Sequence, residues 1–137
     1  MVERSADWIA QAKRDLENAK YETQGKYYEW ACFLSQQSAE KAVKAVYYKL
    51  GAEAFGHSVA GLLARLPPNK EKDEEKSELV SFAKELDKTY IIARYPNMHP
   101  EGAPFNAFTE AEAMRMMAYA ERILRFCEDL LSRIQQG

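Results

Sequence analysis

Hydrophobic residues recur at helical spacing in five segments of the chain, and no segment shows the alternation of a convincing strand. The predicted helices cover residues 5–23, 26–50 and 58–66, a fourth segment that follows the charged run 69–76, and a last segment from 109 to about 134. We therefore predict an all-α fold: an up-and-down bundle of four long helices plus a short one. We see no internal repeat or boundary, so residues 1–137 are expected to form a single helical domain.

The segment 26–50 is predicted to be the central helix, because small residues recur along it at helical spacing and let another backbone approach closely. Gly25 separates it from the first helix, and Gly51 follows it where a left-handed cap is expected. Residues from three of the helices are expected in the core, namely Leu34, Ala42, Leu86, Leu124 and Leu131.

Helix ends and loops are also indicated by the sequence. Pro67 and Pro68 stop the short helix, and Thr109 with Glu112 forms a capping box that starts the last one. Between them, residues 94–108 contain three prolines and are predicted to be an irregular loop. Loops of that length inside a small domain are often functional.

Composition narrows the functional classes. The chain has 137 residues with 19 Lys and Arg against 21 Asp and Glu, so its net charge of −2 argues against a broad nucleic-acid surface but allows a local phosphate site. No stretch approaches the roughly 20 apolar residues of a membrane span, and we expect a cytoplasmic protein without a membrane partner. The only two cysteines, Cys32 and Cys127, are expected to be buried hydrophobes, and neither a metal site nor a cofactor is expected.

The loop contains the first candidate for chemistry, Arg94 followed by His99. An arginine offers a planar, permanently charged fork for a phosphate, and a histidine can move a proton near neutral pH. The segment from Lys88 to Pro100 contains two cations and no acid, which makes it locally positive. The alternative is that Arg94 caps the carbonyls at the end of the fourth helix, beside a solvated histidine.

A polar stripe on the central helix is the second candidate. Its members share two neighbouring helix faces, and they are Gln36, Gln37, Glu40, Lys41 and Lys44. The stripe either is an exposed helix face or faces a groove or a second subunit.

His57, just before the short helix, is the third candidate. It could cap that helix, bind a ligand or be a satisfied structural histidine. Aromatic residues near both ends of the central helix would suit base stacking, although core and interface packing explains them more simply: Tyr27, Tyr28, Trp30, Tyr47 and Tyr48.

Several motifs, taken in order along the chain, resemble one known family. They are the segment 33–45 (FLSQQSAEKAVKA), Gly56-His57-Ser58, the run 86–91 (LDKTYI) leading into Ala93-Arg94-Tyr95-Pro96, and Phe108-Thr109. Together they resemble the HEPN domain (higher eukaryote and prokaryote nucleotide-binding), over residues from about 6 to 131.

The resemblance implies a small helical bundle that forms a homodimer, which the abundant aromatics also favour. Prokaryotic members are often encoded beside a minimal nucleotidyltransferase as toxin and antitoxin, and many are metal-independent ribonucleases with an Arg-x4-6-His motif. The resemblance gives those catalytic roles to Arg94 and His99. Residues expected to bind RNA or nucleotide, or to line the cleft, are Gln37, Glu40, Lys41, Lys44, His57, Tyr95 and Asn97.

The sequence departs from the ribonuclease pattern after the arginine. Tyr95-Pro96 replaces the usual small polar residue and resembles an Arg-Tyr-Pro-Asp branch, with Asn97 in place of the acid. Glu101 stands where some toxins carry a tyrosine that the partner modifies.

Two hypotheses follow. In the first, the protein is an RNA-cleaving or RNA-binding homodimer held in check by a minimal nucleotidyltransferase, a metal-independent endoribonuclease if it is an enzyme. In the second, it is a non-catalytic nucleotide-binding or adaptor module for such a partner, and His99 is incidental.

Overall fold

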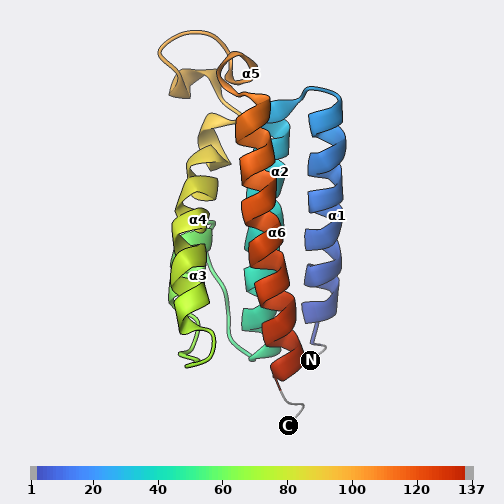
Figure 1. The fold of residues 1–137 in the computed structure, drawn as a ribbon, viewed down its shortest axis with the longest axis vertical. Coiled ribbons are helices and arrows are strands. Elements are labelled where there is room, and N and C mark those ends of the chain that lie inside the picture. The colour runs from blue at the N-terminus through green and yellow to red at the C-terminus, as the bar shows by residue number, and fades with distance from the viewer. Residues whose placement is uncertain (1–2, 135–137) are drawn as a thin grey trace.

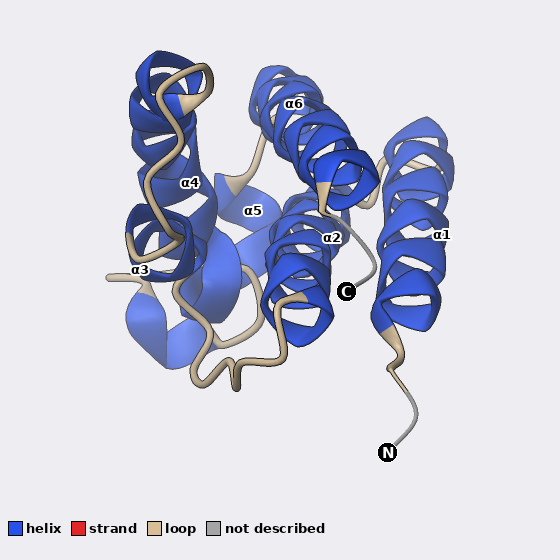
Figure 2. Cartoon of the chain, turned by 90° about the horizontal axis from the view of Figure 1, so that it is seen from below, coloured by secondary structure: helices blue, strands red, loops and turns tan. Residues whose placement is uncertain are grey.

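A computed structural model describes residues 3–134 and confirms the all-α prediction. Its elements in chain order are α1 (Ser5–Gln24), α2 (Tyr28–Lys49), α3 (Val59–Ala64), α4 (Asp73–Ile92), the 3-10 turn η1 (Pro96–Met98), α5 (Pro104–Ala107) and α6 (Glu110–Arg133). The four long helices lie side by side and alternate in direction, and the short α3 packs beside α4 (Figure 1; Figure 2). The predicted up-and-down bundle is therefore confirmed.

Helix α2 is central, as its small residues predict, since it contacts α1, α4 and α6 as well as α3. Ala31, Ala42 and Ala45 are completely buried, and the hydroxyl of Ser38 donates a hydrogen bond of 2.7 Å to the carbonyl of Ala12 in α1. A larger side chain at these positions would separate the two backbones. The small residues thus allow the close packing that places α2 between its neighbours.

Three of the five predicted core residues are correct: Ala42, Leu86 and Leu124 are buried. The predictions for Leu34 and Leu131 are wrong, because both side chains are only half-buried and pack against the core from its margin. Leu131 lies in the last turn of α6, where fewer neighbours cover it.

The helix ends follow their local chemistry. Gly51 adopts the predicted left-handed conformation (φ +76°). After α1, however, Lys26 and not Gly25 takes the left-handed position (φ +68°), so α2 begins two residues later than predicted. The capping box is confirmed, with Thr109 Oγ1 accepting from the Glu112 backbone N–H and Glu112 Oε1 accepting from the Thr109 backbone N–H, each at 3.1 Å.

The loop 94–108 is more ordered than the sequence predicts. It contains the turn η1 and the single helical turn α5, and each begins with a proline, Pro96 and Pro104. Proline suits a first helical position because the N–H that it lacks would have no partner there. The prolines therefore start short helical turns within the loop as well as ending helices.

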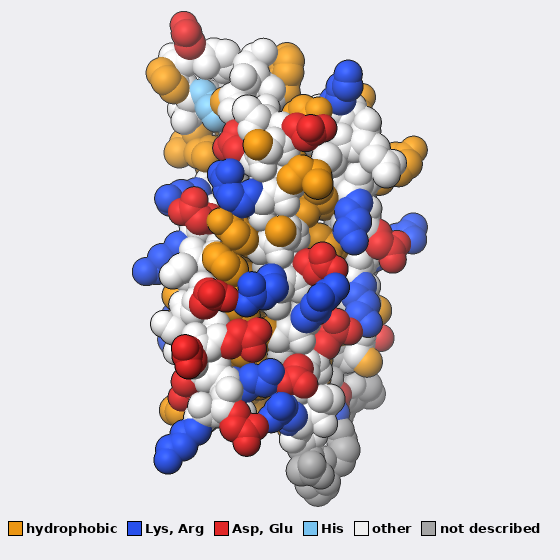
Figure 3. All heavy atoms as spheres, in the orientation of Figure 1, with side chains coloured by type: hydrophobic (Ala, Val, Ile, Leu, Met, Phe, Trp, Pro, Cys, Tyr) orange, Lys and Arg blue, Asp and Glu red, His pale blue; other side chains and the backbone are white. Residues whose placement is uncertain are grey.

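The surface formed by α4 and α6 has mixed charge. Figure 3 shows Lys and Arg side chains interspersed with Asp and Glu over this face. Arg122 of α6 pairs with Glu78 of α4 at 2.6 Å, and Lys13 of α1 pairs with Glu128 of α6 at 2.8 Å. Within residues 3–134, none of the helices is long and apolar enough to span a bilayer.

Candidate functional site

Arg94 lies immediately after α4, at the end of the bundle that carries η1 and α5 (Figure 1). Its Nε donates a hydrogen bond of 2.8 Å to the carbonyl of Tyr90, so the side chain caps the end of α4. Its guanidinium carbon lies 4.5 Å from the ring centre of Phe33, 4.6 Å from that of Tyr90 and 5.1 Å from that of Tyr95. No ion pair to Arg94 exists among residues 3–134, which leaves the terminal nitrogens of a half-buried cation available to an anion.

The side chain of His99 lies at the same end of α4. Its Nε2 lies 2.6 Å from the carbonyl oxygen of Ile92, and its ring meets Phe108 edge-on. A carbonyl oxygen can only accept, so Nε2 carries the proton of the neutral ring and Nδ1 is left free to accept one. Within the described protomer, no hydrogen bond joins His99 to Arg94. The structure therefore places both residues at one helix end, each hydrogen-bonded to a different backbone carbonyl.

Glu40, Lys44 and His57 form a cluster between α2 and the α2–α3 connection. The Glu40 carboxylate, which is 6% exposed, lies 3.1 Å from Lys44 Nζ, and both its oxygens lie 3.2 Å from Nδ1 of His57. Because the carboxylate accepts, Nδ1 of His57 donates, and Nε2 is the nitrogen that remains free. The sequence did not indicate that Glu40 and His57 contact each other.

Tyr90 joins this cluster to Arg94. The His57 ring stacks on the Tyr90 ring with centres 4.7 Å apart and an interplanar angle of 18°. Since the guanidinium of Arg94 packs on the same ring, Tyr90 brings the two side chains into one neighbourhood. The histidine that shares a contact with Arg94 is thus His57.

The connection that carries His57 is anchored through its backbone. Gln36 Nε2 donates to the carbonyl oxygen of His57 at 2.8 Å, which draws residue 57 back along α2 to a level well before the end of that helix. The Asp87 carboxylate of α4 accepts from the backbone N–H groups of Val59 (2.9 Å) and Ala60 (3.0 Å). These bonds fix the start of α3, and with it the position of His57, against α2 and α4.

The polar stripe of α2 is therefore largely internal. Lys41 pairs with Asp15 of α1 and belongs to a different helix interface. Gln37 donates to the side-chain oxygen of Gln36 at 2.8 Å, and Glu40 and Lys44 are buried. These contacts contradict the first of the two sequence alternatives, an exposed helix face.

The remaining predicted site residues, Tyr95 and Asn97, are exposed in the loop after α4. Tyr95 contributes the third ring against Arg94, whereas Asn97 lies in η1 and makes no hydrogen bond to the cluster among the described residues.

Other reactive groups lie outside this site. Burial raises the pKa of the Cys32 thiol to about 12, and burial raises the pKa of the Cys127 thiol as well, so both sulfurs stay protonated at neutral pH and behave as the buried hydrophobes predicted. Among residues 3–134, no three His, Cys, Asp or Glu side chains are grouped so that they could hold a metal ion.

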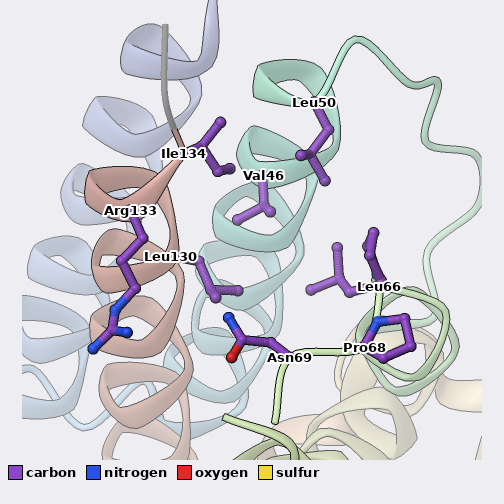
Figure 4. A pocket seen from close by; sticks show the side chains of 9 residues that line it. Val46, Leu50, Leu66, Pro68, Asn69, Leu130, Arg133 and Ile134 are labelled. Atoms are coloured by element: carbon purple, nitrogen blue, oxygen red, sulfur yellow. The ribbon is translucent and has the colours of Figure 1, made fainter. Parts of the chain in front are cut away.

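An apolar cavity of about 160 Å³ lies at the opposite end of α2 (Figure 4). Its lining includes Val46, Leu50, Leu66, Pro68 and Leu130. Because Arg94 packs near the first turns of α2 and this cavity lies at its last, the two are separate features of the molecule.

The protein-family model that describes the HEPN domain matches residues 5–130 of this chain. The chain belongs to the HEPN domain family.

Relatives cover nearly the full length of this HEPN chain. A protein of Methanocaldococcus jannaschii named "Putative toxin MJ1304" is 29% identical over 130 residues, which are 90% of this chain and 86% of the relative. A crystal structure of a Thermus thermophilus protein is 39% identical, with a TM-score of 0.85 over 94% of this chain and 99% of that one.

Two further crystal structures carry the family name. An archaeal HEPN homologue is 43% identical, with a TM-score of 0.78 over 95% of this chain and 99% of its own. A HEPN domain protein from Thermotoga maritima is 45% identical, with a TM-score of 0.71 over 93% and 99%.

Sequence reasoning missed Phe33, Tyr90 and Asp87 as parts of the site. All three lie within the motifs that resembled the family, and that was the signal that could have found them. Periodicity alone places Tyr90 on the apolar face of α4, where a ring that supports an arginine cannot be distinguished from one that fills the core.

Proposed function

We propose that this HEPN protein is a metal-independent endoribonuclease of the toxin type, in which Arg94 binds the RNA phosphate and His99 moves a proton. Membership of the HEPN family supports this function, and so does the relative whose name describes it as a toxin. The proposal further includes a homodimer, a cytoplasmic location and a minimal nucleotidyltransferase partner that restrains the activity.

The main support for the proposal comes from the contacts that surround Arg94. Its Nε is fixed by the Tyr90 carbonyl and its guanidinium is packed on aromatic rings, yet no carboxylate within the described chain neutralises it. An oriented cation of this kind loses little freedom when it binds a phosphate, and it can stabilise the charge that builds up on phosphorus in the transition state.

The reaction needs no group beyond the chain and its RNA. The 2′-oxygen forms a bond to phosphorus as its proton passes to a basic side chain of the protein, the bond from phosphorus to the 5′-oxygen breaks, and the leaving oxygen receives a proton. His99 can donate this proton from Nδ1 when its ring is the imidazolium, because the other ring proton, on Nε2, is held by the Ile92 carbonyl. In the proposed homodimer, two Arg94–His99 pairs would share one groove.

A second function is favoured by one observation, which is that His99 bonds to a backbone carbonyl and not to Arg94. In that case the protein is a nucleotide-binding or adaptor module for a nucleotidyltransferase. Arg94 would then bind a nucleotide phosphate, and RNA would remain intact.

The two functions are separated by incubating purified protein with mixed RNA in excess EDTA. The comparison uses the wild type, Arg94→Ala and His99→Gln, since the glutamine amide can keep the bond to the Ile92 carbonyl while it cannot titrate. We expect cleavage by the wild type alone, with all three thermal midpoints alike.

Intact RNA with the wild type, together with nucleotide binding that Arg94→Ala abolishes, would establish the adaptor instead. Full cleavage by His99→Gln would refute the assignment of His99. Because trace ribonucleases mimic activity, the variants must be purified in parallel with the wild type, and light scattering of the same samples tests the homodimer.

A further inference from the structure

Glu40 and His57 have the geometry of a proton-transferring pair. We propose that they act as one in this protein: His57 accepts the proton of the RNA 2′-hydroxyl and Glu40 orients the ring. This inference rests on the proposed ribonuclease function and adds two residues to it.

The carboxylate is fixed before any substrate arrives. Glu40 is buried in α2, and its charge is balanced by Lys44 at 3.1 Å. Both of its oxygens face Nδ1 of His57 at 3.2 Å, which holds the ring in one orientation and in the tautomer whose Nε2 is unprotonated. A carboxylate so placed also stabilises the imidazolium that forms when Nε2 accepts a proton.

The imidazole itself is accessible. The His57 side chain is 57% exposed, and its Nε2 has no hydrogen-bond partner among the described residues. One ring face is covered by Tyr90, which prevents free rotation, while the rest meets solvent. A base that is rigidly held and open to solvent on one side is suited to a substrate hydroxyl.

The position of the pair fits a phosphate on Arg94. The His57 ring lies 4.7 Å, and the Arg94 guanidinium 4.6 Å, from the same Tyr90 ring centre. The guanidinium and the imidazole are therefore at most about 9 Å apart, a separation that one nucleotide can span with its phosphate on Arg94 and its 2′-hydroxyl toward His57.

A purely structural role leaves the side chain of His57 unexplained. The loop is already held by the backbone carbonyl of residue 57, which accepts from Gln36, and by the cap that Asp87 provides to α3. The imidazole adds one more contact to a segment that is already fixed, while its second nitrogen, Nε2, stays exposed to solvent.

The chemical step divides two proton transfers between two histidines. Nε2 of His57 takes the 2′-hydroxyl proton as the 2′-oxygen bonds to phosphorus, and the bond from phosphorus to the 5′-oxygen breaks. The leaving 5′-oxygen takes the Nδ1 proton of the His99 imidazolium, the acid of the proposed function, and His99 is left neutral. One proton is accepted and one is donated, and the products are a cyclic 2′,3′-phosphate and a 5′-hydroxyl.

The decisive variant is His57→Asn, whose amide nitrogen replaces Nδ1 as the donor to Glu40 and leaves nothing that titrates at Nε2. We expect RNA cleavage to fall by about 10²–10⁴-fold. Affinity for an uncleavable 2′-O-methyl RNA and the thermal midpoint should stay at wild-type values. Glu53→Gln, which changes an exposed acid of the same connection, is the matched control and should cleave normally.

The pH dependence of the cleavage rate distinguishes a catalytic role of His57 from a structural one, because a purely structural residue would not change the shape of that profile. We expect His57→Asn to lose the limb on which the wild-type rate rises with pH, and Glu40→Gln, a positioning variant, to displace that limb. The charged and titratable groups around the ring are Glu40 and Lys44 on α2, Asp87 and Tyr90 on α4, and Arg94 after it.

Cleavage by His57→Asn at the wild-type rate, with RNA left intact by Arg94→Ala and His99→Gln, would overturn this pair and leave the proposed function standing. RNA left intact by the wild type would overturn both.

Discussion

The carboxylate of Asp87 in α4 accepts a hydrogen bond of 2.9 Å from the backbone N–H of Val59, the first residue of α3. A second bond from Ala60 and a third from the hydroxyl of Ser58 make Asp87 the N-terminal cap of a helix that is distant in sequence. This cap, and not a residue of α3 alone, determines where the connection with His57 lies.

Replacing Asp87 with Ala should lower the free energy of unfolding by about 1–3 kcal/mol, because two backbone N–H groups lose their acceptor. Urea unfolding measures this loss. The control is Lys88→Ala, which breaks an exposed ion pair with Glu85 on the same helix and should cost at most about 0.5 kcal/mol. Equal losses in the two variants would show that α3 does not depend on this cap.

Leu86→Ala should cost about 2–5 kcal/mol, since the side chain is completely buried in the core and its removal leaves a cavity. Ile91→Ala on the same helix is the matched control, because Ile91 is 38% exposed and its neighbours can relax. We expect the control to lose less than half as much stability in urea. A loss below about 1 kcal/mol at Leu86 would contradict the assignment of the core face of α4.

Lys41→Met should destabilise the packing of α1 on α2. The Asp15 carboxylate is 9% exposed, and without Lys41 the amide of Gln11, at 2.9 Å, would be its one remaining side-chain partner among residues 3–134. We expect a loss of about 1–3 kcal/mol by thermal or chemical unfolding. Lys13→Met, which breaks an exposed pair with Glu128, should cost no more than about 1 kcal/mol. A larger loss for Lys13→Met than for Lys41→Met would contradict the greater importance of the buried pair.

Stability should fall as the pH rises above about 9. In the unfolded chain the Cys32 thiol deprotonates near its ordinary pKa of 9.0, whereas burial raises the pKa of this thiol in the folded protein to about 12. The unfolded state then binds fewer protons than the native state, so alkali favours unfolding. Urea midpoints measured between about pH 8 and pH 11 give the slope of stability against pH, and Cys32→Ala should make that slope smaller. An unchanged slope would assign the pH dependence to other groups.

Tyr90→Leu should weaken RNA binding, because it removes a ring that supports the Arg94 guanidinium at 4.6 Å. A cation–π contact of about 0.5–2 kcal/mol corresponds to a roughly 2- to 30-fold rise in Kd. Fluorescence anisotropy with 2′-O-methyl RNA gives the value. Tyr90→Phe keeps the ring and should bind like the wild type, and weak binding by this variant would assign the effect to the hydroxyl.

Local chemistry explains why much of the fold could be predicted. The spacing of apolar residues in the segments that became α1, α2, α4 and α6 defines buried faces, and Thr109 with Glu112 fixes the start of α6 through contacts three residues apart. Such features depend on neighbours along one helix and need no tertiary information. Leu34 and Leu131 were misassigned because spacing shows which face is apolar but not how far its margin is covered.

The candidate site was predictable only in part. Arg94, His57 and Glu40 were identified by residue type and family motif, but the contact of His57 with Glu40 joins residues 17 apart through a connection with no regular pattern. The support of Arg94 by Phe33 joins α2 to the end of α4.

The sequence by itself determined the four long helices, the capping box of α6 and the central position of α2, because propensity, periodicity and small-residue spacing act within one element. Tertiary structure alone decided that Tyr90 lies against both Arg94 and His57, and that Asp87 caps α3. These contacts depend on the packing of α2, α3 and α4 against one another, and packing is set by the shapes of all three elements together.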